Sequence, residues 1–301
     1  MNHKLTPSTA LLLTIPPLLW AGNAIVGRLL RDAVPPMTLN LLRWTIALVV
    51  LLPLGWRILR ADAGGAIWTQ WKRYAVLGLF GVGLYNSLQY LALHTSTPIN
   101  VTLVAAGMPV WMMLVGRMFF SVAVSGRQMA GALLSIAGVL VVLCRGDIQL
   151  LRELHLVPGD LFMIGATIAW SFYTWILLQP KDPPELRASW SAFLFAQVLY
   201  GVLWSALFSA IEWTVAPAHM RWNAGVLAGL AYVAIGPAIV AFRCWGAGVQ
   251  EAGPSAGAFF ANLTPLFAAL LSSAFLGEAP HLYHALAFLA IVGGIVLSSK
   301  K

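Results

Sequence analysis

Charged residues are scarce in this 301-residue chain: Asp, Glu, Lys and Arg together make up 9% of it. Soluble domains carry roughly 25% charged residues, because their surfaces must face water. Since 60% of the residues are hydrophobic, most of this chain must contact lipid or other protein. The composition excludes a cytosolic enzyme, a disordered tail and a DNA-binding domain. It predicts an all-α integral membrane protein.

Cysteine is also rare. Cys144 and Cys244 both lie in apolar runs, so we expect free thiols rather than a disulfide. Acidic residues number 10 against 18 Lys and Arg, which leaves a formal net charge of +8. The basic residues stand mostly singly along an apolar chain. They therefore indicate membrane topology, and we expect no nucleic-acid partner.

Long apolar runs, interrupted by few charged residues, make up most of the sequence. A helix needs about 20 apolar residues to cross the hydrocarbon core of a bilayer. Ten such runs are separated by short segments rich in charge, Pro and Gly, which leaves no room for a separate soluble domain. The ten predicted spans cover residues 10–30, 37–54, 74–93, 99–120, 128–144, 158–178, 189–211, 224–249, 255–276 and 281–299.

The distribution of Lys and Arg predicts the orientation in the membrane. With the N-terminus inside, the cytoplasmic segments and adjoining span ends hold eleven basic residues, and the opposite side holds five. This excess predicts cytoplasmic N and C termini in a multi-pass protein of the inner (plasma) membrane. The small residues at 21–24 resemble a signal-peptide cleavage site. Because the apolar run continues to Leu30, we expect this segment to be the first span.

The two halves of the chain resemble each other. Pro109 in the fourth span and Pro265 in the ninth are 156 residues apart, as are the prolines that open these two spans. Because each half holds five spans, an odd number, the second half enters the membrane from the opposite side. We therefore expect two inverted five-helix repeats, at residues 1–148 and 149–301.

Short motifs add to this pattern. They are Leu18–Ala21 with Asn23 in the first span, Leu42–Trp44 early in the second, Leu276–Glu278 after Pro265, and the Gly293–Gly294 pair in the last span. With these motifs the chain resembles the drug/metabolite transporter superfamily, EamA type, over nearly its whole length. One segment departs from the family. Residues 121–123 read Ser-Val-Ala where Leu-Gly-Glu is expected, so the first half lacks the glutamate that the second half has.

The resemblance implies a ten-helix transporter of small molecules that is not an enzyme and uses no cofactor. Within the family, the chain is similar to YddG-type exporters of aromatic and other neutral amino acids, which implies amino-acid substrates, and export is taken from this resemblance alone. Two alternatives stay open: an exporter of another small metabolite or drug, with or without proton coupling, and a membrane protein that does not transport. His281 and His284 lie three residues apart with no third ligand in view, so we expect no metal site.

Polar and aromatic residues inside the spans are candidates for a substrate site, because polar groups at membrane depth usually face a cavity or another helix. Such a lining suits an amino acid: rings stack on an apolar body, and amides hydrogen-bond a small zwitterionic head. The alternative is that the rings anchor the membrane interface or fill the core. The predicted substrate-binding residues are Trp20, Asn23, Tyr85, Asn86, Gln89, Tyr90, Trp170, Tyr173, Tyr232, Asn262 and Arg243.

Two prolines and two arginines inside spans call for separate interpretations. Pro109 and Pro265 each remove a backbone hydrogen bond, which predicts bending points for gating; alternatively they only shape the helices. Arg243 is expected either to draw a carboxylate toward the cytoplasmic mouth or to extend to the interface. For Arg43 we expect extension to the interface, because it lies within about two turns of a helix end; the alternative is a functional role, as for other arginines buried at membrane depth.

Acidic residues are missing from the middle of every predicted span. Asp160 and Glu278 lie near span ends. Proton-driven transporters usually carry a carboxylate at mid-membrane as a proton relay. The sequence therefore predicts facilitated transport down a gradient, that is, a uniport.

Overall fold

The chain was analysed as a computed structural model. It describes residues 5–56, 67–96, 98–147, 149–150, 157–179, 181–215, 219–276 and 281–299. The described residues form helices and turns and no β-strand. Within these described residues, seven helices are long and apolar enough to cross a membrane, which agrees with the predicted class of protein. Glu278 and the basic residues Lys4, Arg57, Arg60, Arg152, Lys300 and Lys301 lie outside the described residues.

Six of the predicted spans correspond to single α-helices. These are α1 (Pro7–Leu30), α2 (Pro36–Gly55), α8 (Gly126–Leu143), α9 (Pro158–Leu177), α11 (Trp190–Val215) and α16 (Leu282–Ser299), with the short α10 (Pro184–Ala188) before α11. Many of these helices begin on proline, which has no N–H to leave unpaired at that position. The start of α8 is set differently: the Ser125 hydroxyl accepts a bond from the Gln128 N–H, and the Gln128 side chain accepts one from the Ser125 N–H.

Two spans contain a π-helical turn in their middle. The first runs through α4 (Trp71–Leu77), the π-helical segment η2 (Gly78–Leu84) and α5 (Tyr85–Thr95). The second runs through α12 (Ala224–Val233), the π-helical segment η4 (Ala234–Val240) and α13 (Ala241–Ala252). The two π-helical segments are 156 residues apart at both ends, the same separation as the two prolines. A π-turn adds a residue to the helix and so rotates everything that follows.

Two other spans are each built from two helices in series. The predicted span 99–120 consists of α6 (Pro98–Ala106) and α7 (Met108–Phe120), and 255–276 consists of α14 (Pro254–Ala261) and α15 (Thr264–Leu276). Both breaks lie just before a proline, Pro109 or Pro265, because the ring would clash with the carbonyl four residues earlier. Both lie at equivalent places in the two halves.

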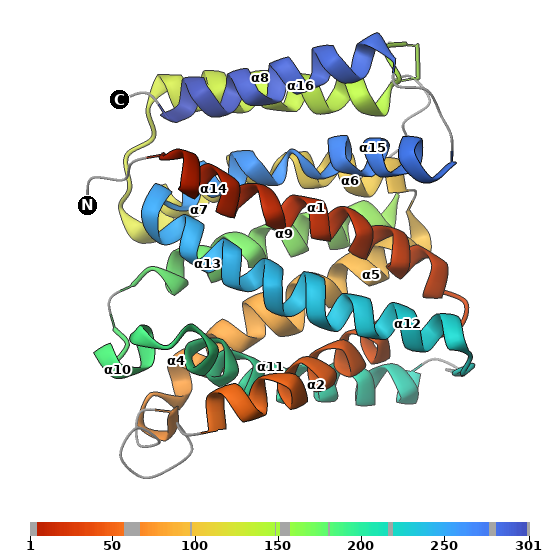
Figure 1. The fold of residues 1–301 in the computed structure, drawn as a ribbon, viewed down its shortest axis with the longest axis vertical. Helices are drawn as coiled ribbons and strands as arrows, with labels where there is room; N and C mark the ends of the chain where they lie inside the picture. The colour runs from red at the N-terminus through yellow and green to blue at the C-terminus, as the bar shows by residue number, and fades with distance from the viewer. Residues whose placement is uncertain are drawn as a thin grey trace.

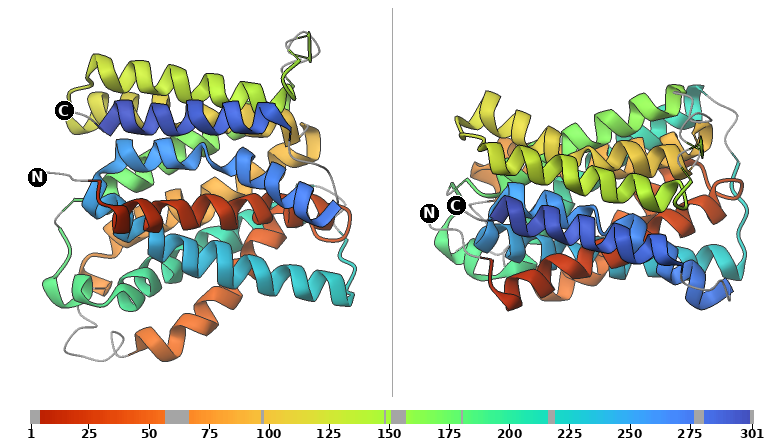
Figure 2. Two further views of the ribbon diagram at one scale, coloured as in Figure 1. Left: turned by 45° about the horizontal axis from the view of Figure 1, so that its top comes forward. Right: turned by 90° about the horizontal axis from the view of Figure 1, so that it is seen from above.

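The helices run roughly side by side along one direction, with α8 packed on α16 at one edge and α2 packed on α11 at the other (Figures 1 and 2). α1 begins and α16 ends at the same end of the bundle (Figure 1), which we call the terminal end. Arg28 near the end of α1 donates to the Leu93 carbonyl near the end of α5. Ser96, the first residue after α5, donates its hydroxyl to Asp160 at the start of α9. Hence α1 and α9 run in opposite directions.

Apolar side chains cover the outside of the bundle. Leu29, Met118 and Leu282 are each more than 70% exposed. A water-soluble protein would not leave a wide apolar surface exposed in this way, whereas lipid chains cover it. Cys144 and Cys244 are both buried as free thiols.

Candidate functional site

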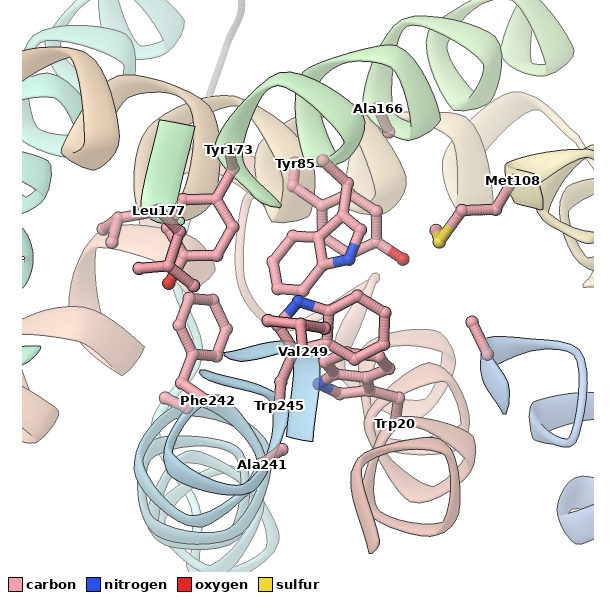
Figure 3. Close-up of a cluster of buried hydrophobic side chains, with 14 of the residues drawn as sticks. Trp20, Tyr85, Met108, Ala166, Tyr173, Leu177, Ala241, Phe242, Trp245 and Val249 are labelled. Carbon is pink, nitrogen blue, oxygen red and sulfur yellow. The ribbon is translucent and has the colours of Figure 1, made fainter. Parts of the chain in front are cut away.

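Six buried rings meet at the centre of the bundle, where α1, α5, α9 and α13 come together (Figure 3). Trp170 of α9 is fully buried, and its ring centroid lies 4.9–5.4 Å from those of its neighbours. Edge-to-face and tilted contacts at this spacing are the favourable geometries for aromatic pairs. We call this group the aromatic cluster: Trp20, Tyr85, Trp170, Tyr173, Phe242 and Trp245.

The aromatic cluster draws its rings from both halves of the chain, and two of them directly follow the π-helical segments. Tyr85 is the first residue after η2, and Phe242 is the second after η4. The extra residue in each π-turn rotates the following helix, which points these rings to the centre. Sequence analysis identified Trp20, Tyr85, Trp170 and Tyr173 but missed Phe242 and Trp245. The repeat of the two halves could have identified them: Phe242 and Trp245 lie 156 residues after Asn86 and Gln89, which are both predicted site residues.

Arg43 is completely buried beside the aromatic cluster. Its Nη1 donates to Asn23 Oδ1 at 3.2 Å, to Asn86 Oδ1 at 2.6 Å and to the Tyr90 hydroxyl at 3.1 Å. The expectation that Arg43 extends to the interface is therefore wrong. Arg43 lies about two turns from the start of α2, but it is on a face of that helix that packs against α5, and its guanidinium also bonds Asn23 of α1.

The neighbours of Arg43 are themselves linked. The Tyr90 hydroxyl donates to Asn23 Oδ1 at 2.8 Å, and Asn23 Nδ2 donates to Gln89 Oε1 at 3.3 Å. We call Arg43 and these residues the polar cluster: Asn23, Arg43, Asn86, Gln89 and Tyr90. The structure thus brings four predicted site residues together around an arginine that sequence analysis had placed elsewhere.

A small cavity of about 60 Å³ joins the two clusters to the helix breaks. Trp20 and Tyr85 of the aromatic cluster and Gln89 of the polar cluster line it, together with Asn262 and Pro265 at the second break. Asn262 is buried, and its amide donates to the Ser135 hydroxyl of α8 at 2.8 Å. The helix breaks therefore border the same space as the predicted substrate-binding residues.

Two predicted site residues lie away from this centre. Tyr232 is 36% exposed on the outside of the bundle, and its hydroxyl donates to the Leu19 carbonyl at 3.0 Å. Arg243 lies toward the terminal end, where its guanidinium stands 5.6 Å from the Trp190 ring centroid. There it lines a hollow of about 210 Å³ together with Arg187 and Gln197. Arg243 thus lies at a mouth, whereas Tyr232 faces away from the interior.

Charged groups tie the structure together at the terminal end. Asp182 is buried and receives two bonds from Arg73, from Nε at 2.7 Å and from Nη2 at 2.8 Å. Arg187 and the Tyr74 hydroxyl donate to the same carboxylate. Paired bonds of this kind between Arg and a carboxylate are strong and directional. This group, which we call the latch, connects α4 of the first half to the segment after α9 in the second.

The opposite end is hollowed instead. A groove of about 840 Å³ lies between the ends of α2, α5 and α11, lined in part by Leu91, His94, Phe208 and Glu212. Glu212 also holds the start of α2, because its carboxylate accepts bonds from the Met37 and Thr38 N–H groups. The bundle is therefore tied at the terminal end and grooved at the other.

Acidic residues within the described helices lie close to helix ends. Asp160 is the third residue of α9, Glu251 the penultimate residue of α13, and Glu212 lies one turn from the end of α11. Among the described residues, no group of three His, Cys, Asp or Glu side chains is placed to hold a metal ion.

The sequence matches the profile of the EamA-like transporter family twice, over residues 7–144 and 157–300. An uncharacterized transporter of Archaeoglobus fulgidus is 26% identical over 100% of this chain and 99% of its own length. The aromatic amino acid exporter YddG of Ancylobacter novellus is 28% identical over 94% of this chain and 93% of its own. A crystal structure of a protein at 24% identity aligns with a TM-score of 0.72, covering 97% of this chain and 96% of the other, which shows a shared fold.

Proposed function

Because the chain belongs to the EamA-like transporter family, we propose that it exports neutral, mainly aromatic and hydrophobic amino acids by alternating access. The observation that carries this proposal is the pairing of the aromatic cluster with the polar cluster at the junction of the two halves. Rings accommodate an apolar or aromatic body, and amides, a hydroxyl and a guanidinium accommodate a polar head. The relative named as an aromatic amino acid exporter supports the same substrate class.

The proposed architecture is ten membrane spans in two inverted five-helix repeats, at residues 1–148 and 149–301. It is supported by the two π-helical segments and the two helix breaks, which recur at equivalent places. Inverted repeats of this kind carry their substrate site at the repeat interface near the bilayer midplane. The excess of Lys and Arg supports placing the terminal end in the cytoplasm of a cell whose inner membrane holds the protein.

The proposed gating uses the two helix breaks. Pro109 and Pro265 are each the second residue of the second helix in a broken span. Met108, next to Pro109, and Pro265 line the cavity that the two clusters share. Backbone without a continuous hydrogen-bond ladder bends at a lower energetic cost than an intact helix. With the latch formed, the terminal end is closed, and bending at the breaks alternates access between the two ends.

The proposed mechanism is a uniport. Proton-driven transporters usually carry a carboxylate at mid-membrane as a relay, whereas the acidic residues of the described helices lie near the helix ends.

Counterflow in proteoliposomes tests the proposed substrate class. Vesicles loaded with one unlabelled amino acid should take up labelled tryptophan when they contain tryptophan, phenylalanine or leucine. Vesicles loaded with lysine or glutamate should not, since their second charge has no partner in the aromatic cluster. Uptake that is equal for all five loads, or absent for all, would refute the proposed substrates. Uptake driven only by an unrelated metabolite or drug would support the alternative exporter.

A further inference from the structure

We infer that Arg43 binds the carboxylate of the transported amino acid, with Asn86 as a further hydrogen-bond donor. This inference rests on the proposed function and makes it more specific. It assigns a carboxylate as the group that the site requires, and it makes a buried cation the source of that requirement.

The charge of Arg43 has no partner of opposite sign within the described part of the chain. Its three side-chain partners, Asn23, Asn86 and Tyr90, are all neutral, and the described ion pairs involve other residues. A fully buried cation costs several kcal/mol unless an anion compensates it. Neutral acceptors compensate part of this cost, and an anionic ligand would compensate the rest.

Among the buried side-chain atoms that lack a hydrogen-bond partner in the described part of the chain, donors outnumber acceptors by five to two. Arg43 uses only Nη1, so Nε and Nη2 are left without a partner among the described residues. The Asn86 Nδ2 group and the indole N–H groups of Trp44 and Trp170 are likewise buried and unpartnered. Each such donor destabilises the folded protein when it is left unsatisfied. A carboxylate brings two oxygens that accept several bonds and carries the compensating charge.

The free edge of Arg43 suits this ligand. Nε and Nη2 are adjacent on one side of the guanidinium and form the fork that binds a carboxylate with two parallel bonds. Asn86 Oδ1 accepts a bond from Arg43 Nη1 at 2.6 Å. The Nδ2 group of the same Asn86 amide therefore also lies close to the guanidinium. The bonds from Nη1 hold the guanidinium in place, which leaves the other two nitrogens for a ligand.

Arg43 is also joined to the aromatic cluster. Its guanidinium carbon lies 5.1 Å from the Trp44 ring centroid, and the Trp44 ring lies 4.9 Å from that of Phe242. Phe242 in turn contacts Trp170 at 5.2 Å. An amino acid with its carboxylate on Arg43 therefore has its side chain within reach of the rings. The adjoining cavity of about 60 Å³ is smaller than an amino acid, so the rings and helix breaks must separate to admit it.

The test compares ligands that differ only in the carboxylate. Tryptophan and tryptophanamide are offered as internal loads for counterflow of labelled phenylalanine. The wild-type protein should prefer tryptophan over the amide by about tenfold or more, the size expected for hydrogen bonds to a charged group. Indole-3-propionate, which keeps the carboxylate and lacks the amine, should compete better than tryptamine.

Variants assign this preference to Arg43. Arg43→Gln should reduce exchange of tryptophan much more than exchange of the amide, so that the preference disappears. Arg43→Lys keeps the charge but loses the paired geometry, and it should retain a reduced preference even if Arg43→Gln fails to insert. Arg28→Gln is the control, because Arg28 bonds a backbone carbonyl near the end of α1, and it should keep the full preference.

Two results would overturn the inference while leaving amino-acid transport intact: equal exchange of tryptophan and its amide by the wild-type protein, or an unchanged preference in Arg43→Gln. The absence of exchange with any amino acid in the wild-type protein is a different result. It would overturn the proposed function and this inference with it.

Discussion

Trp170 contacts five other rings of the aromatic cluster and is completely buried. Removing such a side chain costs roughly 3–5 kcal/mol in a packed core, so an alanine at this position would test stability as much as transport. Tyr85 is the better position to test, because it lines the shared cavity and contacts only Trp170 within the cluster.

Tyr85→Ala should reduce amino-acid flux by about tenfold, because it removes an aromatic contact worth about 1 kcal/mol or more along with part of the cavity wall. Tyr232→Ala is matched in chemistry but removes a ring on the outside of the bundle, and it should keep the wild-type rate. Initial rates in proteoliposomes at equal protein content measure both. Equal rates in the two variants would contradict the placement of the site.

Depth along a span was enough to identify Trp20, Tyr85 and Trp170 as interior rings. It failed for Tyr232, because depth does not determine which side of the helix faces inward. Tyr232 lies two residues before the π-helical segment η4, so the rotation that directs Phe242 inward comes after it. The prediction for Arg43 was wrong for the same reason, because its distance from a helix end does not say which face of α2 the residue lies on.

The π-helical segment η2 depends on a side chain from another helix. Asn40 of α2 is fully buried, and its Nδ2 donates to the Val82 carbonyl at 2.9 Å and to the Ser87 hydroxyl at 3.0 Å. The backbone also approaches α11 very closely here. A Cβ on Gly78 would lie 2.6 Å from the backbone nitrogen of Gly201. Side-chain donors commonly satisfy the carbonyls that irregular membrane helices release.

Asn40→Ala should therefore lower the stability of the folded protein by about 1–2 kcal/mol, the upper range for a hydrogen bond between membrane helices. Thermal unfolding in detergent measures this as a lower Tm. Ser87→Ala, which removes one partner of Asn40 and leaves the Val82 carbonyl bonded, should have a smaller effect. An unchanged Tm in Asn40→Ala would contradict a role for this residue in holding η2.

The helix break at Gly107 gives the prediction for gating. Pro109→Ala restores an N–H that can bond the carbonyl of Ala105 and make α6 and α7 continuous. Turnover should fall several-fold while the concentration of tryptophan for half-maximal exchange changes little. Measuring both in counterflow separates the two effects. If turnover stays at the wild-type level, the break does not serve gating.

Pro109 and Pro265 located both breaks to within a few residues, because they recur at equivalent places in the two halves. A proline alone was not sufficient, since Pro16 and Pro17 lie within the continuous helix α1. The π-helical segments could not be predicted in the same way. The segment η2 contains three glycines and η4 contains Pro237, but these residues do not distinguish a π-turn from a simple break. In η2 the π-turn also depends on contacts from α2 and α11 that are distant in sequence.

At the scale of the whole molecule, the latch at the terminal end and the groove at the other describe a transporter closed on one side. Asp182→Asn removes the charge that holds Arg73 and Arg187, so it should favour opening of the terminal end. Ala247→Cys, in the hollow at that end, reports opening in a background where Cys144 and Cys244 are replaced by serine. Labelling of this cysteine by a water-soluble maleimide should be several-fold faster with Asp182→Asn.

Asp32→Asn provides the matched control for this experiment, because Asp32 pairs with Arg31 in an exposed ion pair at the opposite end. Exposed pairs contribute about 0–1 kcal/mol, so labelling at residue 247 should stay at the wild-type rate. Faster labelling in Asp32→Asn, or no change in Asp182→Asn, would contradict the role of the latch.

Net flux in proteoliposomes tests the central claim most directly. Labelled tryptophan or phenylalanine is placed on one side of the membrane, and initial rates are compared with and without an imposed proton gradient. We predict flux down the amino-acid gradient at rates that the proton gradient does not change. Flux that requires the proton gradient, or accumulation of amino acid against its own gradient, would contradict the uniport. No flux of either amino acid would contradict the account of the site itself.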